Sequence, residues 1–312
     1  MEADFLSSSE RGPWEEFWAS CPDALLYQHP DFIDIFSFRA QRAGCIGFWD
    51  QGRLAALLPA GLIAEDGLTI LTAPFSAGFG GFLLKPGLSI RKMLALLEAA
   101  RQAAKRLGAN AIRLITPPFI YQEQISDALD YALVASGFSE EPGELTAFLS
   151  CGKQIGAQAR QNAKRALKEG LVFEADYDLA EIHGFIAEEK EKLKFSFNLP
   201  LAPLLELNRR IPQAIYGARL ALKGATAAAI IGQRINQRAS LGFAWAHDPE
   251  FSPMKPVDLL LAETARQAFA EGRQFWDMGT VTLGGKLVQG VARFKNKFDP
   301  DYALRRKFQI RL

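Results

Sequence analysis

Residues 89–115 read SIRKMLALLEAARQAAKRLGANAIRLI, and this stretch predicts a long helix followed at once by a buried strand. Apolar side chains recur at helical spacing through Ile90–Leu107, with Ser89 able to cap the first turn and Gly108 where a helix commonly ends. The apolar run Ala111–Ile115 predicts the strand, and two prolines follow it. A helix feeding directly into a buried strand indicates an α/β protein.

The same pattern returns near the C-terminus, where a periodic helix over Val257–Glu271 is followed by Gly272 and a strand over Phe275–Met278. Both helices contain the string Ala-Arg-Gln-Ala. A second matched pair of strands begins after tight turns at Gly52 and Gly224. The partners lie roughly 165 to 172 residues apart, in the same order, which predicts a duplicated α/β domain.

Each half is expected to hold helices, an antiparallel meander, a long helix and a strand, in that order. In the second half the meander is predicted over Ile215–Leu222, Ala225–Ile235 and Ala239–His247, with tight turns between the strands.

The chain has 312 residues, about twice a typical domain length. A broken strand and the start of a basic helix near Phe148–Gly156 mark the boundary between the halves. We therefore predict an N-terminal domain over 1–150 and a C-terminal domain over 151–312.

The composition is that of an ordinary globular protein, and the formal charge of +1 gives no general preference for nucleic acid. Cys21, Cys45 and Cys151 are odd in number and far apart, so we expect buried free thiols rather than disulfides or a zinc site. No apolar run is long enough to cross a bilayer, and the N-terminus has no signal-peptide pattern. We expect a cytoplasmic protein without a bound metal or a transmembrane segment.

The segment from Asp277 to Asp299 has the richest chemistry, with Gly279 and three further glycines where backbone must approach a ligand or another strand closely. Lys295 follows Phe294, which places a cation beside an apolar surface. A desolvated lysine can stabilise a developing oxyanion or hold a phosphate. Alternatively, Lys295 is a solvated lysine on an amphipathic segment, as most lysines are.

A second group of cations opens the C-terminal half. Arg160 and Lys164 are four residues apart and share a helix face, and Arg165 follows them. Such a cluster can hold the phosphates of a nucleotide-linked substrate, coenzyme A or tRNA. The alternative is a solvated helix face balanced by nearby acidic residues.

Three aromatic and imidazole side chains are weaker candidates. Trp245 and His247 end a predicted strand and could line a cleft, and Tyr121 follows a pair of prolines. Single residues of this kind more often serve packing. No Ser-His-Asp order and no histidine pair with metal-ligand spacing is present.

In their order along the chain, several segments resemble FemAB-like and BioF2-like proteins, which belong with the GNAT-like acyltransferases. Trp276–Gly279 followed by Gly290–Phe298 is similar to the family ending "DfG … G…FK..FG". Leu26–Phe32 resembles the early "hPdf" segment, and Gln161–Arg165 resembles the helix that opens the second domain. The resemblance covers nearly the whole chain.

The resemblance implies an α/β fold of two tandem GNAT-like (acyl-CoA N-acyltransferase-type) domains, with mixed, mostly antiparallel sheets flanked by helices. It places the family's active lysine on Lys295 and the DfG residues on Asp277 and Gly279, of which Asp277 could be purely structural. Better-known members take amino acids from aminoacyl-tRNA to peptidoglycan precursors, and BioF2-like members are expected to use acyl-CoA. Neither donor is a tightly bound cofactor.

Two departures bear on the donor. Asp299 stands where the family usually has glycine, and Phe251–Pro256 replaces the Gly-rich loop that binds the pyrophosphate of coenzyme A before a helix. This puts coenzyme A binding in doubt. No long charged heptad segment is present, so the helical arm of some tRNA-dependent members is absent.

The leading expectation is a transferase that moves an aminoacyl or acyl group onto an amine of a cell-envelope precursor or related small molecule. Direct attack of the amine, without a covalent enzyme intermediate, fits the lack of a nucleophile triad. The alternatives are an acetyl-CoA-dependent N-acetyltransferase on a sugar nucleotide or small amine, and a catalytically silent binding module. We predict catalysis by Lys295 and substrate binding by Phe294, Asp277, Gly279, Arg160, Lys164, Arg165, Trp245 and Tyr121.

Overall fold

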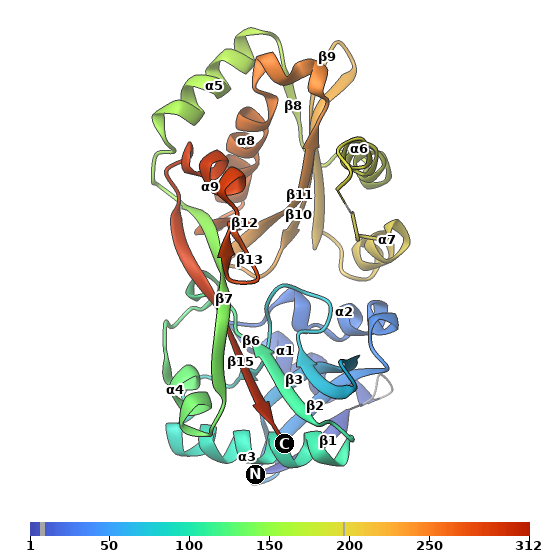
Figure 1. Ribbon diagram of the computed structural model, residues 1–312, viewed down its shortest axis with the longest axis vertical. Coiled ribbons are helices and arrows are strands. Elements are labelled where there is room, and N and C mark those ends of the chain that lie inside the picture. Colours follow the sequence, from blue (N-terminus) through green and yellow to red (C-terminus); the bar gives the residue numbers. More distant parts are fainter. Residues whose placement is uncertain (7–9, 196) are drawn as a thin grey trace. The chain divides into compact units, whose positions relative to one another are not determined.

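The computed structural model describes residues 1–6, 10–195 and 197–312, which fold as two compact units (Figure 1). Unit 1 contains Met1–Glu144 and Leu304–Leu312, and unit 2 contains Leu145–Ala303. The chain passes from one unit to the other within strand β7 (Ser139–Ser150) and again within strand β15 (Asp301–Arg311).

The division expected at residues 150 and 151 differs from these units at both crossing strands. The chain end belongs with unit 1 because β15 pairs in antiparallel fashion with β6 (Ala111–Ile115), from Lys307 opposite Ile115 to Arg311 opposite Ala111. The last residues of β7 instead pair with β12 (Phe275–Thr280) in unit 2. Each sheet is therefore completed by a strand from the other half of the sequence.

The sheet of unit 1 has the order β1-β2-β3-β4-β6-β15. Only the β4–β6 pair is parallel among these neighbours, so the sheet is mixed and mostly antiparallel. A two-residue strand, β5, pairs with β3. The bounds of the strands not yet given are β1 Glu2–Leu6, β2 Arg42–Asp50, β3 Arg53–Glu65, β4 Leu68–Ala73 and β5 Leu83–Leu84.

The long helix α3 (Ile90–Arg106) confirms the prediction from the opening stretch. Ser89 accepts a hydrogen bond from the backbone N–H of Lys92, and Gly108 takes a positive φ of 82° just after the helix. The buried face of α3 packs with α4 in the core of this unit, whereas α1 and α2 contact β2 and β3. These helices span Gly12–Ser20 (α1), Pro30–Ile35 (α2) and Ala128–Ala135 (α4).

The sheet of unit 2 has the order β7-β12-β11-β10-β9-β8, and only β11 and β12 run parallel. The predicted meander is confirmed. β9 (Ile215–Leu222) and β11 (Ala239–His247) have the expected bounds, and β10 (Ala225–Arg234) ends one residue early. The outer strand β8 covers Val172–Glu174.

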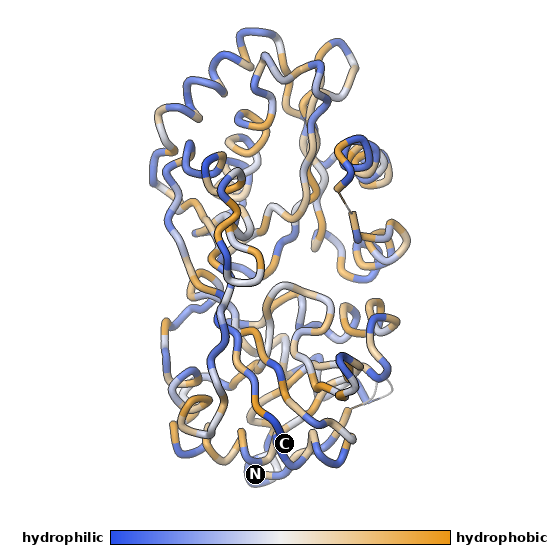
Figure 2. Tube along the Cα trace, in the orientation of Figure 1, coloured by the Kyte–Doolittle hydropathy of each residue, from blue (hydrophilic) through white to orange (hydrophobic). Residues whose placement is uncertain are grey.

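Helices cover both faces of the sheet in unit 2 (Figure 1). The pair α5 (Ala157–Lys168) and α8 (Pro256–Ala270) packs on one face, and α6 (Leu179–Lys192) and α7 (Leu201–Arg210) lie on the other. α5 is mostly hydrophilic, and its buried residues are Ala159, Ala163 and Ala166 (Figure 2). A small hairpin, β13 (Thr282–Leu283) with β14 (Lys286–Leu287), leads into α9 (Gln289–Asn296).

The two units repeat one order of elements: β2-β3-β4-α3-β6 in unit 1 and β9-β10-β11-α8-β12 in unit 2. In each, an antiparallel meander is followed by a helix that leads into a strand parallel to the last meander strand. The duplicated α/β organisation expected from the sequence is therefore present.

The cysteines are free thiols, as predicted, but only Cys21 and Cys45 are buried and Cys151 is exposed. Within the described ranges, no cluster of three or more side chains is suited to hold a metal ion. The helices in these ranges are also too short or too polar to span a membrane.

Replacing Gly232 with alanine tests the packing of the meander. A Cβ atom at this position would overlap the ring of Tyr216, so we expect G232A to lower the free energy of unfolding by about 1–3 kcal/mol. Gly184 in α6 has open space around it, and G184A should be neutral or stabilising by up to about 1 kcal/mol. Urea unfolding followed by circular dichroism measures both, and equal effects would contradict the packing.

Candidate functional site

Strands β11 and β12 separate in the middle of unit 2. They pair only where Ala239–Leu241 faces Phe275–Asp277, and beyond this point each strand continues along its own course. The register of the neighbouring strands is irregular on both sides of this point. That of β10 against β11 shifts at Ile231 and Gly232, and that of β12 against β7 shifts after Asp277. We call the point where β11 and β12 separate the fork.

Asp277 organises the β12 side of the fork. Its side chain is fully buried, and its Oδ1 accepts hydrogen bonds from Thr146 Oγ1 at 2.5 Å and from the backbone N–H of Gly279 at 2.6 Å. Gly279 has a φ of 77°, a conformation that favours glycine because it carries no Cβ. The carboxylate therefore holds the backbone turn just beyond the point where the strands separate.

Lys295 lies against this turn. The residue is 3% exposed, and its Nζ donates hydrogen bonds to the carbonyl oxygens of Gly279 at 2.8 Å and Thr280 at 2.9 Å. The same atom lies 5.6 Å from the ring centre of Trp245 on β11. A cation held by carbonyl dipoles and an aromatic face, away from water, exerts a strong local field.

The fold thus brings four of the predicted residues together at the fork: Asp277, Gly279, Trp245 and Lys295. Phe294 precedes Lys295 on α9 and is half-buried. Its ring packs on Phe298 at 5.9 Å and under the Lys297 ammonium at 4.6 Å. Phe294 supports the position of α9 through this packing, and its predicted role in substrate binding remains a prediction.

The predicted cations of α5 form a different surface. Arg160 is half-buried, whereas Lys164 and Arg165 are exposed and Arg165 lies 3.9 Å from the carboxylate of Glu169. The helix directs its alanines, not these cations, toward α8. Phosphate binding by this group remains a prediction.

Tyr121 belongs to unit 1, within the short helix Phe119–Tyr121. Its side chain is fully buried and stacks on Phe79, with ring centres 4.6 Å apart. Tyr121 therefore packs within unit 1, where it also lines a small cavity, and its predicted role in substrate binding remains a prediction.

The N-terminus of α8 carries its own negative charge. Asp258 in the first turn is buried, accepts a hydrogen bond from Asn162 Nδ2 at 2.8 Å and pairs with Lys297 at 3.5 Å. Pro256 has no N–H to offer at the helix start. Free N–H groups and a positive helix dipole are what attract a phosphate to such a terminus, and both are reduced here.

His247 has a defined hydrogen bond that sequence reasoning did not identify. Its Nε2 lies 3.0 Å from the hydroxyl oxygen of Ser252 in the 3₁₀ helix η5 (Pro249–Met254). Burial lowers the pKa of His247 below its ordinary value of 6.5, and the charge of Glu189 acts in the opposite direction. The sequence did carry one signal for this position. Trp245 and His247 are two residues apart on a strand, which predicts that their side chains lie on the same face.

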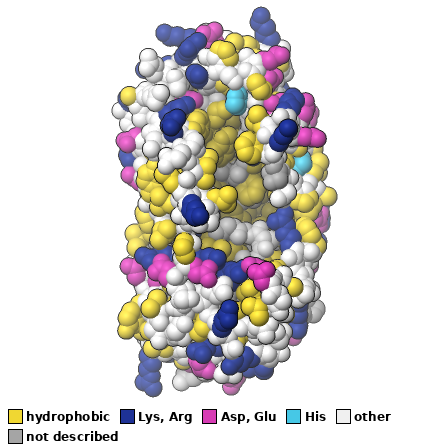
Figure 3. Space-filling model, viewed as in Figure 1, with side chains coloured by type: hydrophobic (Ala, Val, Ile, Leu, Met, Phe, Trp, Pro, Cys, Tyr) yellow, Lys and Arg dark blue, Asp and Glu magenta, His cyan; other side chains and the backbone are white. Residues whose placement is uncertain are grey.

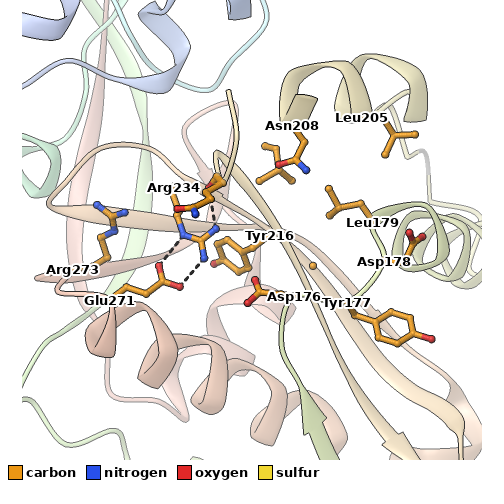
Figure 4. A pocket seen from close by; sticks show the side chains of 13 residues that line it. Asp176, Tyr177, Asp178, Leu179, Leu205, Asn208, Tyr216, Arg234, Glu271 and Arg273 are labelled. Atoms are coloured by element: carbon orange, nitrogen blue, oxygen red, sulfur yellow. Dashed lines mark hydrogen bonds and ion pairs between the residues drawn. The ribbon is translucent and has the colours of Figure 1, made fainter. Parts of the chain in front are cut away.

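A cavity of about 810 Å³ opens at the C-terminal end of β10, around Tyr216 and Arg234 (Figure 4). Arg234 is held by Glu271 at 2.8 and 2.6 Å, and the Tyr216 hydroxyl lies 3.2 Å from Trp276 Nε1. Burial raises the pKa of Tyr216 to about 12, so the phenol stays neutral. The described lining includes none of the predicted site residues, and two of its charged residues, Arg234 and Glu271, are paired with each other.

A broader hollow is visible in unit 2 on the face shown in Figure 3. It lies between the side that carries α8 and α9 and the side that carries α6, and hydrophobic side chains line its floor. Because Lys295 is on α9 and Trp245 is on β11, the elements of the fork border this hollow.

Comparison with known proteins identifies the fold. Residues 156–296 match the family described as "Acetyltransferase (GNAT) domain". FemX is similar over 100% of this chain and 98% of its own, with a TM-score of 0.76 and 15% identity. The C-terminal domain of a putative lysylphosphatidylglycerol synthetase from Agrobacterium fabrum is similar over 97% and 91%, with a TM-score of 0.63 and 15% identity.

A tandem GNAT protein from the clavulanic acid biosynthesis pathway is also similar, over 99% of this chain and 98% of its own, with a TM-score of 0.55 and 14% identity. No curated protein matches by sequence. The likeness confirms the tandem GNAT-like fold, and with it the FemAB-like architecture that the sequence resembles.

The role of Asp277 can be tested by comparing D277A with D277N. Alanine leaves the Gly279 N–H and the Thr146 hydroxyl without their acceptor, so we expect a loss of about 2–4 kcal/mol in the free energy of unfolding. Asparagine keeps one oxygen acceptor and should lose less. Chemical denaturation measures both variants, and a D277A protein as stable as the wild type would contradict the assigned role.

Proposed function

We propose that this chain, which has the FemX-like tandem GNAT fold, is a transferase that moves an aminoacyl or acyl group onto an amine. The acceptor in this proposal is a cell-envelope precursor or a related small molecule. One observation carries the proposal: a buried ammonium, Lys295 Nζ, is held at the point where two parallel strands separate. Support also comes from the match of residues 156–296 to an acetyltransferase domain.

The reaction would be a direct displacement. The neutral amine attacks the carbonyl carbon of an ester or thioester, a C–N bond forms, and the C–O or C–S bond of the donor breaks. Lys295 stabilises the negative charge that develops on the carbonyl oxygen. No enzyme nucleophile is required, because holding both substrates in contact supplies much of the rate enhancement.

The fork suits this chemistry because it exposes a strand edge next to the cation. Beyond Leu241, β11 has no strand partner on the β12 side in the described structure, so its backbone N–H and C=O groups are available to an extended ligand. A donor or acceptor bound along this edge would lie close to Trp245 and Lys295. The carbonyl groups of Gly279 and Thr280 keep the ammonium in place as the substrates change.

The start of α8 favours an aminoacyl ester over acyl-CoA as the donor. A pyrophosphate at this helix would find no N–H on Pro256. The positive end of the helix is already occupied by the buried Asp258 carboxylate, which pairs with Lys297 at 3.5 Å. The second candidate, an acetyl-CoA-dependent N-acetyltransferase, is supported by the acetyltransferase description of the matching family. Such an enzyme would need a different pyrophosphate site.

Calorimetry with acetyl-CoA, uncharged tRNA and aminoacyl-tRNA separates the two donors. We expect aminoacyl-tRNA to bind more tightly than uncharged tRNA, and acetyl-CoA to bind weakly or not at all, because of the charge at the start of α8. Micromolar binding of acetyl-CoA, without a preference for charged tRNA, would reverse the assignment of the donor. No binding of any donor would favour a catalytically silent module.

Replacing Lys295 tests the catalytic cation directly. We expect K295M to lower kcat/KM for transfer by about 10²–10³-fold, because the oxyanion loses its stabilising charge. K286M is the matched control, because Lys286 is exposed on the β13–β14 hairpin nearby in sequence. Product formation is followed by mass spectrometry, with circular dichroism to verify folding. Full activity of folded K295M would overturn the role.

A further inference from the structure

Strand β11 carries a second group on the same face as Trp245. Residues two apart on a strand point to the same side, so Trp245 and His247 share a face and lie about 7 Å apart along the strand. Trp245 is the residue whose ring approaches the Lys295 ammonium. His247 therefore lies on the same strand and the same face as the ring that contacts the buried cation.

Ser252 orients the imidazole ring. The 3.0 Å contact joins Ser252 Oγ to Nε2, and η5 holds the serine in place because Asp248 accepts a hydrogen bond from the backbone N–H of Glu250 at its start. When Nε2–H donates to the serine hydroxyl, Nδ1 keeps its lone pair and can accept a proton. In that tautomer Nδ1 is basic, and the serine hydroxyl fits it as the acceptor of the Nε2–H.

The charges around His247 suit a group that gains a proton only briefly. Burial disfavours the imidazolium, Lys255 at the start of α8 adds to this effect, and Glu189 and Asp248 oppose it. Glu189 on α6 is 3% exposed, and its Oε1 pairs with Lys192 at 2.6 Å. Its Oε2 has no hydrogen-bond partner in the described part of the chain. A buried carboxylate of this kind supplies negative charge that favours a nearby imidazolium.

We propose that His247 is the general base of the transfer reaction, with Ser252 as a positioning residue. This inference rests on the proposed function. The amine loses a proton to Nδ1 as its nitrogen bonds to the carbonyl carbon. When the C–O or C–S bond of the donor breaks, the leaving oxygen or sulfur takes that proton back. Lys295 keeps its charge throughout, so the cation and the base have separate tasks.

The S252A variant also tests whether His247 and Ser252 act together in a different way, with Ser252 as a nucleophile. If His247 activated Ser252 as a nucleophile, the acyl group would pass through an ester on Oγ. S252A would then abolish transfer, and a trapped adduct would appear on Ser252 by mass spectrometry. The general-base proposal instead expects S252A to lose only several-fold in rate, because the hydroxyl orients the ring and does not react. An adduct on Ser252 would overturn it.

The first experiment does not depend on any substrate. The histidine resonances of the wild-type protein are titrated by NMR, with H247Q used to assign His247. We expect a His247 midpoint below 6.5, a ¹⁵N signature of the Nε2–H tautomer, and a lower midpoint in E189Q, because a charge that favours the imidazolium is removed. An ordinary midpoint or the Nδ1–H tautomer would contradict the role of His247. An unchanged midpoint in E189Q would contradict the effect of the Glu189 charge on His247.

The second experiment measures transfer to a lysine-containing UDP-linked peptide, with alanyl-tRNA and acetyl-CoA as alternative donors. We expect H247Q to lower kcat/KM by about 10²-fold and to remove the rise in rate as pH increases through the His247 pKa. H183Q is the matched control, because His183 lies in the same unit and contacts the Leu199 carbonyl instead. Wild-type transfer with an unchanged H247Q pH profile overturns this inference alone. No transfer by the wild type overturns the proposed function as well.

Discussion

The exchange of strands between the two halves of the sequence is the constraint on which the site depends. β7 belongs to the first half of the chain, yet its end pairs with β12 and brings Thr146 opposite Thr280 in unit 2. Thr146 is one of the two donors to Asp277, and the other is the Gly279 N–H, whose turn presents the carbonyl that binds Lys295. A hydroxyl from one half of the sequence thus helps to place the buried ammonium of the other.

The buried ammonium is costly for the fold. Removing an ammonium from water costs several kcal/mol unless polar groups replace the lost hydration. Two carbonyl oxygens and the Trp245 ring provide part of that replacement. The carbonyl groups lie at the end of β12, where its register against β7 shifts between Asp277 and Thr280. This irregular backbone presents the Gly279 carbonyl to the buried ammonium and not to a regular ladder.

Local patterns in the sequence predicted the elements and the residues at the fork. The bounds of β9 and β11 follow from turn residues and alternation, and Lys295, Asp277 and Gly279 come from a motif whose members are close in sequence. The exchange of β7 and β15 leaves no local signal, because pairing between residues more than 120 apart is decided by the whole sheet. The contact of His247 with Ser252 was missed for a similar reason: it depends on how η5 folds back after the strand.

Burial decides which form of His247 is favoured. It disfavours the charged imidazolium, and the positive charge of Lys255 acts in the same direction. The imidazole is consequently neutral at neutral pH and ready to accept a proton. The charge of Glu189 opposes the lowering of the His247 pKa. This suits a base, because a group whose pKa is too low would accept the proton of an amine poorly. Burial and Lys255 on one side, and the carboxylates of Glu189 and Asp248 on the other, thus set how basic His247 is.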